Sequence, residues 1–256
     1  MTERDASLAE SSHWEARGAK ISAGVRIERH CWFREQSRRI GPVLAVQGKR
    51  SVVELGAYPG HILDWACRIS GLAGTAVEYV PAQARALAAA FPSLEVVQGD
   101  FLSDEVIQPG RSWDVVMSFG LVEHWADLRV PVERHLELVS PAGHCVIGMP
   151  LHDGPYGRLL GVLDPSLLAK HGRYSVGDLR RAFETVATRG WHLEFCGAVE
   201  GVGFWNCGVN ERVAKLPAWL QGITNKSLAA WHRSVTRLPA PAPLRPNALL
   251  IARKSH

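Results

Sequence analysis

Short apolar segments typical of buried strands alternate with helical segments through the middle of this chain. The predicted strands cover residues 51–55, 75–79, 94–98, 113–118 and 144–149, and the predicted helices between them cover residues 62–69, 82–91 and 130–139. Strands joined by helices of this length cannot form hairpins, so we expect them to lie parallel in one sheet. The alternation therefore predicts an α/β fold with a doubly wound sheet that carries helices on both faces.

The segments outside this alternation are expected to surround one edge of the sheet. After residue 150 the chain continues with a stretch at 151–175, a predicted helix at 176–188, a strand at 191–195, a second stretch at 203–246 and a last strand at 247–253. Ligands of doubly wound sheets bind beyond the carboxyl ends of the strands, so residues 1–48, 151–175 and 203–246 are candidates to cover that edge. Residues 1–48 indicate helical segments with a buried stripe formed by Trp32, Phe33, Ile40, Val43 and Leu44. A turn is expected at 140–143, and the alternating prolines of 238–244 favour an extended connector.

The composition is that of an ordinary folded protein and excludes several classes. The 256 residues are 46% hydrophobic and 21% charged, which does not fit a disordered or fibrous chain. The formal net charge of +4 is spread along the sequence and predicts no polyanionic partner, so nucleic acid is not favoured. Five cysteines without a Cys-x-x-Cys pair argue against a disulfide framework and a structural zinc site, and favour the cytoplasm. No apolar run approaches the roughly 20 residues of a membrane span, so we expect no membrane insertion.

The loop after the first predicted strand has the features of a ligand-binding turn. It runs from Glu54 to Gly60, and its glycines allow a ligand to approach the backbone. A dinucleotide fingerprint would need glycines at positions 56, 58 and 61, but the chain has Tyr58 and His61 at two of them. Glu78 ends the second strand, where a doubly wound fold places a carboxylate for the hydroxyls of a ribose. A nucleoside without a diphosphate is therefore the expected ligand.

Asp100 and Phe101 follow the third predicted strand and extend this pattern. A carboxylate there accepts hydrogen bonds from an exocyclic amine, and an aromatic ring beside it packs against a purine. Each acid on its own is more often a turn or cap residue than a ligand. The combination is more informative than any single residue.

Taken in order, these segments resemble the class I S-adenosylmethionine-dependent methyltransferases, and most closely their broad bacterial small-molecule group. The segments that carry the resemblance are 53–60, 77–79, 99–101, 113–124 and 138–143. The resemblance implies a seven-stranded, mostly parallel sheet of the Rossmann-like type with a reversed last strand. It also implies S-adenosylmethionine as cofactor. Residues 49–256 would then form the methyltransferase domain, preceded by an N-terminal helical lid at 1–48.

The resemblance also implies roles for individual residues in cofactor binding. By position, Glu54, Gly56, Ala57 and Gly60 would contact the methionine part, Glu78 the ribose hydroxyls, Asp100 and Phe101 the adenine, and Ser118 and Phe119 the floor of the site. Tyr79 is a further candidate for cofactor binding. Two positions depart from the family pattern. Tyr58 replaces the middle glycine of the loop, and Ala142 replaces a glycine of the usual Pro-Gly-Gly turn.

The methyl group of a sulfonium is already activated, so transfer mainly requires that the acceptor atom lie about 3–3.5 Å from the carbon, in line with the leaving sulfur. A base helps only when the acceptor is a hydroxyl, a thiol or a protonated amine, and histidine suits that task near neutral pH. The candidates near the expected edge are Glu123, His124, His152, Asp153, Tyr156, His171 and Tyr174. We favour His124 and His152 as catalytic residues, although either one could simply bind a backbone carbonyl.

The sequence predicts no metal, because it shows no trio of two carboxylates and an amide suited to Mg²⁺. After the fourth strand it has Ser118-Phe-Gly-Leu121, not the Asp/Asn-Pro-Pro-Tyr/Phe sequence of enzymes that methylate amines of nucleic-acid bases. The aromatic residues of the last insertion, including Trp205, Trp219 and Trp231, could line a substrate pocket, anchor a lid or form an oligomer contact.

The function that we expect is cytoplasmic methylation of a small organic molecule of secondary metabolism, with oxygen favoured over nitrogen as the acceptor. Two alternatives stay open. Tyr58 in the glycine loop motivates a protein that binds S-adenosylmethionine without methyl transfer, and the fold is also compatible with an RNA methyltransferase. The sequence leaves the oligomeric state open, and a homodimer is compatible with it.

Overall fold

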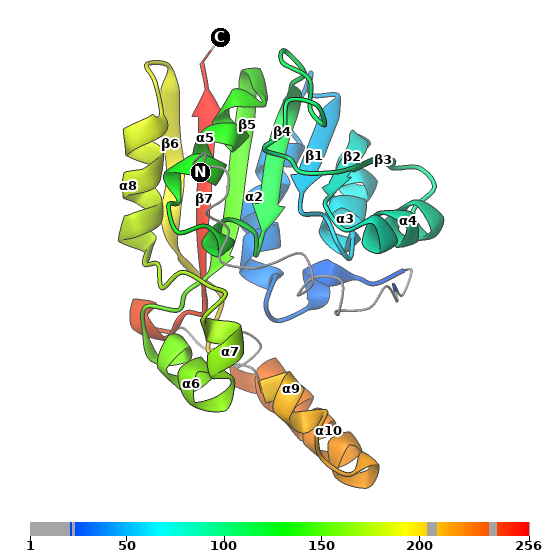
Figure 1. The fold of residues 1–256 in the computed structure, drawn as a ribbon, viewed down its shortest axis with the longest axis vertical. Coiled ribbons are helices and arrows are strands. Elements are labelled where there is room, and N and C mark those ends of the chain that lie inside the picture. The colour runs from blue at the N-terminus through cyan, green and yellow to red at the C-terminus, as the bar shows by residue number, and fades with distance from the viewer. Residues whose placement is uncertain (1–20, 22–23, 204–208, 236–239, 256) are drawn as a thin grey trace.

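Seven strands form a single sheet in the computed structural model, which describes residues 21, 24–203, 209–235 and 240–255. The strands are β1 (Ser51–Leu55), β2 (Ala73–Glu78), β3 (Glu95–Gln98), β4 (Trp113–Phe119), β5 (Val139–Pro150), β6 (Trp191–Val199) and β7 (Asn247–Lys254). Their order is β3-β2-β1-β4-β5-β7-β6. The first five strands pair in parallel, and β7 is antiparallel to both β5 and β6. The predicted fold class and the reversed last strand are therefore confirmed (Figure 1).

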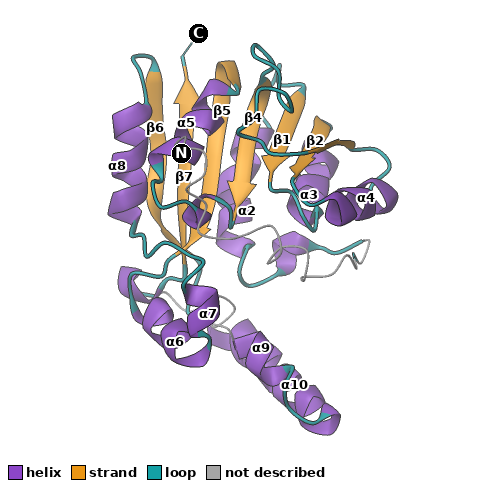
Figure 2. Cartoon of the chain, in the orientation of Figure 1, coloured by secondary structure: helices purple, strands orange, loops and turns teal. Residues whose placement is uncertain are grey.

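Helices cover both faces of this sheet (Figure 2). The α-helices are α2 (Arg34–Leu44), α3 (His61–Ser70), α4 (Pro81–Ala90), α5 (Arg129–Glu137), α6 (Pro155–Leu163), α7 (Pro165–Leu168), α8 (Val176–Val186), α9 (Val209–Val213) and α10 (Ala218–Val235), and the 3-10 helices are η2 (Ile27–Arg29), η3 (Val122–His124) and η4 (Ala242–Leu244). One buried cluster joins α5 and α8 to one face, and another joins α2, α3 and α4 to the other. Alternation along each strand supplies both clusters, since Val52 belongs to one and Val53 to the other.

Two segments differ from the sequence prediction. The expected turn at 140–143 is an irregular part of β5, where pairing with β4 moves from Trp113↔Val139 to Val115↔His144. The extra residues are accommodated as a bulge, and Ala142 takes a positive φ of 60°. In the proline-rich connector, Pro241 is extended as predicted, but residues 242–244 form η4, and residues 236–239 lie outside the described part of the chain.

The remaining segments lie near the carboxyl ends of the parallel strands. Helices α6, α7, α9 and α10 extend from that end of the sheet, and α10 projects away from it (Figure 1). In the N-terminal segment, four members of the predicted stripe are buried, namely Phe33, Ile40, Val43 and Leu44, while Trp32 is partly exposed. No helix within the described residues combines the length and apolar character needed to cross a membrane. Cys31, Cys67, Cys145 and Cys196 are free thiols, and Cys207 lies outside the described residues.

Candidate active site

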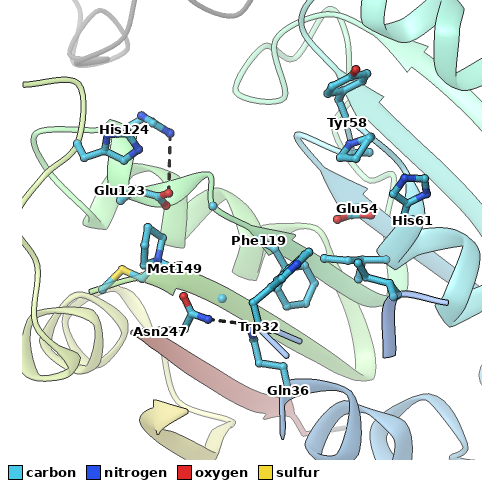
Figure 3. Close-up of a pocket in the computed structure, with 18 of the residues that line it drawn as sticks. Trp32, Gln36, Glu54, Tyr58, His61, Phe119, Glu123, His124, Met149 and Asn247 are labelled. Atoms are coloured by element: carbon cyan, nitrogen blue, oxygen red, sulfur yellow. Dashed lines mark hydrogen bonds and ion pairs between the residues drawn. The ribbon is translucent and has the colours of Figure 1, made fainter. Parts of the chain in front are cut away.

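A cavity of about 300 Å³ lies at the carboxyl ends of β1, β4 and β5. The loop after β1 forms one side of it, and η3 after β4 forms the other. Figure 3 shows Glu54, Tyr58 and His61 on the first side and Glu123 and His124 on the second, with Phe119 between them in this view. The N-terminal segment and the 151–175 insertion complete the lining. The cavity therefore lies where the topology of a doubly wound sheet predicts a ligand.

Glu54 supplies a buried carboxylate to the β1 side of the cavity. Its side chain is 4% exposed, and Oε2 accepts a hydrogen bond of 3.0 Å from the backbone N–H of Leu63, in the first turn of α3. Burial raises the pKa of Glu54 well above its usual range, and the nearby carboxylate of Glu78 adds to the effect. A cationic ligand group at this position favours the ionised form of Glu54.

Gly60 allows the loop to pass close to the helices that follow. Its φ is +85°, and a Cβ at this position would lie 2.6 Å from Leu87 and 2.7 Å from Phe91. Any other residue would therefore strain the backbone and collide with the core beneath the cavity. The loop is also tied to β2, because the N–H groups of Gly56 and Ala57 both donate to the carbonyl of Val77.

Glu78 holds the same loop from the end of β2. Its carboxylate accepts hydrogen bonds from the N–H of Tyr58 (3.2 Å) and the N–H of Val80 (3.0 Å). Burial raises the pKa of Glu78, and these backbone donors oppose that shift. Tyr58, at the position of the missing glycine, belongs to the cavity lining, and its N–H takes part in this contact. The neighbouring Tyr79 is 53% exposed.

The residues predicted to contact adenine lie in a different environment. Asp100 accepts a hydrogen bond of 2.9 Å from the N–H of Leu102, which is a turn contact. The ring of Phe101 is buried, with its centroid 5.4 Å from that of Trp125 and 5.9 Å from that of His135. Ser118 is fully buried, and its hydroxyl donates to Nε2 of His135 over 2.8 Å.

The structure thus brings only some of the predicted cofactor residues to this cavity. Its lining includes Glu54, Ala57, Gly60 and Phe119, whereas Gly56, Glu78, Tyr79, Asp100, Phe101 and Ser118 lie outside that lining. Glu78 borders the cavity through its contact with Tyr58. The roles assigned to these residues stay predictions.

Both predicted catalytic histidines lie in the lining, together with Glu123 and His171. His124 and His152 are each 3% exposed. The ring centroid of His171 lies 4.4 Å from that of His124 and 5.0 Å from that of His152. Three imidazoles from η3 and the 151–175 insertion therefore meet at the side of the cavity opposite Glu54.

Backbone carbonyls fix the orientation of two of these rings. Nδ1 of His124 lies 2.7 Å from the carbonyl oxygen of Lys170, and Nδ1 of His171 lies 2.8 Å from that of Leu167. A carbonyl oxygen only accepts hydrogen bonds, so each Nδ1 carries the proton. In the neutral ring, Nε2 of each histidine then holds the lone pair.

The other sequence candidates in the insertions have structural contacts. The hydroxyl of Tyr156 donates to the carbonyl of Leu244, and that of Tyr174 donates to the carbonyl of Trp125. Asp153 is exposed. No described residue of 203–246 belongs to the cavity lining. Of the tryptophans in that stretch, Trp219 is 70% exposed on α10, Trp231 is partly exposed, and Trp205 lies outside the described residues.

Several lining residues were missed in the sequence, namely Ile27, Trp32, Gln36, Gly148, Met149 and Asn247. The carbonyl of Trp32 accepts hydrogen bonds from Gln36 (2.9 Å) and Asn247 (3.4 Å). The bond from Asn247 attaches the N-terminal segment to the first residue of β7. No local motif marks them, because the partners lie up to 215 positions apart.

Comparisons with known proteins point to one family. The family model described as a methyltransferase domain matches residues 10–191. Similar solved structures include an S-adenosylmethionine-dependent methyltransferase from Archaeoglobus fulgidus (TM-score 0.55, 19% identity, covering 86% of this chain and 91% of the other). Another such enzyme, from Mesorhizobium loti, has a TM-score of 0.54 and 16% identity and covers 85% and 97% of the two chains. The cyclase SpnF is also similar (TM-score 0.57, 14% identity, 89% and 83% covered). At these identities the structural likeness shows the fold alone, and no curated protein matches the chain.

Proposed function

Because this chain belongs to the methyltransferase domain family and is an S-adenosylmethionine-dependent methyltransferase, we propose that its acceptor is a small organic molecule. The size of the cavity carries this proposal. Its volume of about 300 Å³ is at the small end of the range of ligand pockets, and the methionine part of the cofactor takes up some of it, so the remaining space suits a compact acceptor. Trp32, Phe119 and Leu160 give the lining apolar surface for such a molecule.

The residues on the β1 side of the cavity fit the methionine part of the cofactor. Glu54 offers a buried carboxylate for its ammonium group, and Gly60 leaves the backbone accessible beside it. Glu78 holds the loop in this shape and borders the position proposed for the ribose. When bound, the cofactor supplies an activated methyl group on a sulfonium. The chain itself has to hold the acceptor in line with that group.

His124 and His152 are the proposed bases for an acceptor hydroxyl, which we favour over an amine. Both lie in the lining opposite Glu54, where the acceptor has to bind. Because Nδ1 of His124 donates to the carbonyl of Lys170, its Nε2 is the atom that would take the proton. Imidazole suits this task because its ordinary pKa is close to neutral pH.

We further propose that residues 49–256 form the methyltransferase domain and that acceptor choice resides in two of the three covering segments. The N-terminal segment contributes Ile27, Trp32 and Gln36 to the lining, and the 151–175 insertion contributes His152, Leu160 and His171. The described residues of 203–246 contact the insertion instead, for example through Arg212, which donates to the carbonyl of Leu163.

The experiment that tests this function combines calorimetry with mass spectrometry. We expect S-adenosylhomocysteine to bind with one site per chain, and small-molecule extracts incubated with S-adenosylmethionine to yield a product heavier by one CH₂ group. Binding without any such product would support the alternative of a protein that does not transfer methyl groups. Affinity for RNA that falls steeply with salt would instead support an RNA methyltransferase.

A further inference from the structure

A carboxylate and two imidazoles converge at the side of the cavity opposite Glu54. Glu123 and His124 come from η3, directly after β4, and His171 comes from the loop after α7. One carboxylate oxygen and one nitrogen from each ring all lie within 4.8 Å of one another. Oε1 of Glu123 is 3.8 Å from Nε2 of His124. We propose that Glu123, His124 and His171 bind a divalent transition-metal ion.

The orientation of the histidines is a second observation that supports this site. Nδ1 of His124 and Nδ1 of His171 each donate to a backbone carbonyl, so each ring holds its lone pair on Nε2. Histidines that bind metals usually donate their other ring N–H to a carbonyl or carboxylate in this way, which fixes both the tautomer and the ring orientation. Proximity alone would not require either ring to be held like this.

The backbone also fixes the two segments against each other. The N–H of Gly172 donates to the carbonyl of Glu123 over 2.7 Å, and the carbonyl of Lys170 accepts from His124. The residues on either side of His171 are therefore attached to η3. This arrangement preorganises the three side chains, although they lie up to 48 positions apart in the sequence.

The donor set selects the class of metal. Imidazole nitrogens with one carboxylate suit Zn²⁺, Fe²⁺, Co²⁺ or Ni²⁺, whereas Mg²⁺ and Ca²⁺ prefer oxygen ligands. The expectation of no metal rested on the missing Cys-x-x-Cys pair of structural zinc sites and on the missing oxygen ligands for Mg²⁺, and neither absence bears on two histidines with one carboxylate. Glu123 brings a carboxylate to this side of the cavity, and the described lining contains no lysine or arginine, so a bound cation also offsets negative charge there.

Three protein ligands leave positions on the ion for a further oxygen. An acceptor hydroxyl bound there would be more acidic, and His152, whose ring centroid is 5.0 Å from that of His171, would be the nearby group to take its proton. The methyl group would then pass from the sulfonium to that oxygen, and S-adenosylhomocysteine would leave. With the ion bound, His124 is a ligand and His152 is the remaining base. The role of the ion in activating the acceptor rests on the proposed function, whereas the binding of the ion does not.

The test measures metal binding separately from catalysis. The chain, without a histidine tag, is stripped with a chelator and titrated with Co²⁺, whose visible absorption reports nitrogen and oxygen ligands. We expect one ion per chain, and an affinity at least about tenfold lower in Glu123→Gln and in His171→Gln. The matched control is His61→Gln, which changes a histidine on the other side of the same cavity and should leave Co²⁺ affinity within about twofold.

Binding of S-adenosylhomocysteine to each variant verifies that it is folded. If the stripped protein binds this nucleoside but no Co²⁺, the metal site is wrong and the proposed function is unaffected. The site is equally wrong if Glu123→Gln and His171→Gln bind both the nucleoside and Co²⁺ as well as the original chain does. If metal binds as expected but the chelated enzyme methylates at full rate, the role in activating the acceptor is overturned.

Discussion

Glu54 is a buried carboxylate whose charge depends on what occupies the cavity. Because burial raises its pKa, the folded protein without ligand keeps this proton at pH values where the unfolded chain has lost it. The ionised form is the one that pairs with an ammonium group. We therefore expect the affinity for S-adenosylhomocysteine to rise as the pH increases above the ordinary pKa of a glutamate, and calorimetry at several pH values measures this.

The substitution Glu54→Gln should remove the pH dependence of S-adenosylhomocysteine affinity and weaken the binding of this ligand. The amide oxygen can still accept the N–H of Leu63, so the loop should keep its shape, but a charge-assisted contact worth about 1.5–3 kcal/mol is lost. This corresponds to roughly 10- to 150-fold in Kd. The exposed Glu105 provides the matched control, since Glu105→Gln should change nothing. A Glu54→Gln variant that binds as tightly as the original chain would exclude Glu54 from the site.

For Ser118 we predict an effect on stability and none on ligand affinity, because its hydroxyl contacts a histidine in the core. Removing the hydroxyl leaves Nε2 of the buried His135 without its donor, and burial lowers the pKa of that histidine to about 4, so the ring stays neutral. We expect Ser118→Ala to cost about 1–3 kcal/mol of unfolding free energy in urea and to leave nucleoside affinity unchanged. Ser227→Ala on the exposed face of α10 is the control. A loss of affinity with unchanged stability would return Ser118 to the cofactor site.

Local motifs singled out Glu54 and Gly60 because one short loop contains both, and both lie in the cavity lining. Ser118 and Phe119 show where this reasoning ends. Successive residues of β4 point to opposite faces of the sheet, so one side chain meets His135 and the other meets the cavity. The sequence contains the alternation, but it does not show which face lies beside the ligand.

The helix α2 is held in place by a contact between residues 165 positions apart in the sequence. No side chain of its own caps the first turn; instead, the carboxylate of Glu200, just after β6, accepts the N–H groups of Glu35 and Gln36 at 2.9 Å each. In return, Glu35 accepts the N–H of Glu200 and pairs with Arg245. This arrangement positions Gln36 and the preceding Trp32 at the cavity.

Burial raises the pKa of Glu200 to about 7, with a smaller contribution from the like charge of Glu35, while the backbone donors and Arg34 oppose it. An acid whose pKa is raised on folding binds its proton more tightly in the folded state, so this contribution to stability is lost as the pH rises from about 4.5 to 7. We expect the unfolding free energy of the original chain, relative to Glu200→Gln, to fall across this range.

Urea denaturation at pH 5, 6, 7 and 8 measures this difference. The glutamine oxygen can still accept both N–H groups, so Glu200→Gln should stay folded, whereas Glu200→Ala loses the cap and about 0.5–2 kcal/mol at every pH. A difference between the original chain and Glu200→Gln that does not vary with pH would show that Glu200 titrates normally.

At the level of elements, the sequence predicted the strands and helices of the sheet because periodicity and turn residues are local. It placed the start of β5 five residues too late, since a bulge with a positive φ at Ala142 looks like a turn in the sequence. The contact of α2 with Glu200 was not predictable, because the partners are 165 positions apart. The proximity of His171 to Glu123 was not predictable for the same reason, since these residues are 48 positions apart.

For the molecule as a whole, the cavity is formed by three parts of the chain that are remote in sequence. The sheet edge supplies Glu54 and Phe119, the N-terminal segment supplies Trp32 and Gln36, and the 151–175 insertion supplies the remaining wall with His152 and its neighbours. A ligand that contacts all three should stabilise them together. At a hundredfold excess over Kd, binding adds about 2.7 kcal/mol to the unfolding free energy.

Hydrogen–deuterium exchange with and without S-adenosylhomocysteine measures where this stabilisation occurs. We expect slower exchange in residues 27–36, 54–63 and 160–171, because the cavity draws its lining from each of these segments. Exchange in α10 should be unchanged, because none of the side chains described for that helix lines the cavity and the helix projects from the sheet edge (Figure 1). Protection of α10 would mean that this helix closes over the ligand. Protection confined to residues 54–63 would mean that the nucleoside contacts the sheet edge alone, with the other two segments left to the acceptor.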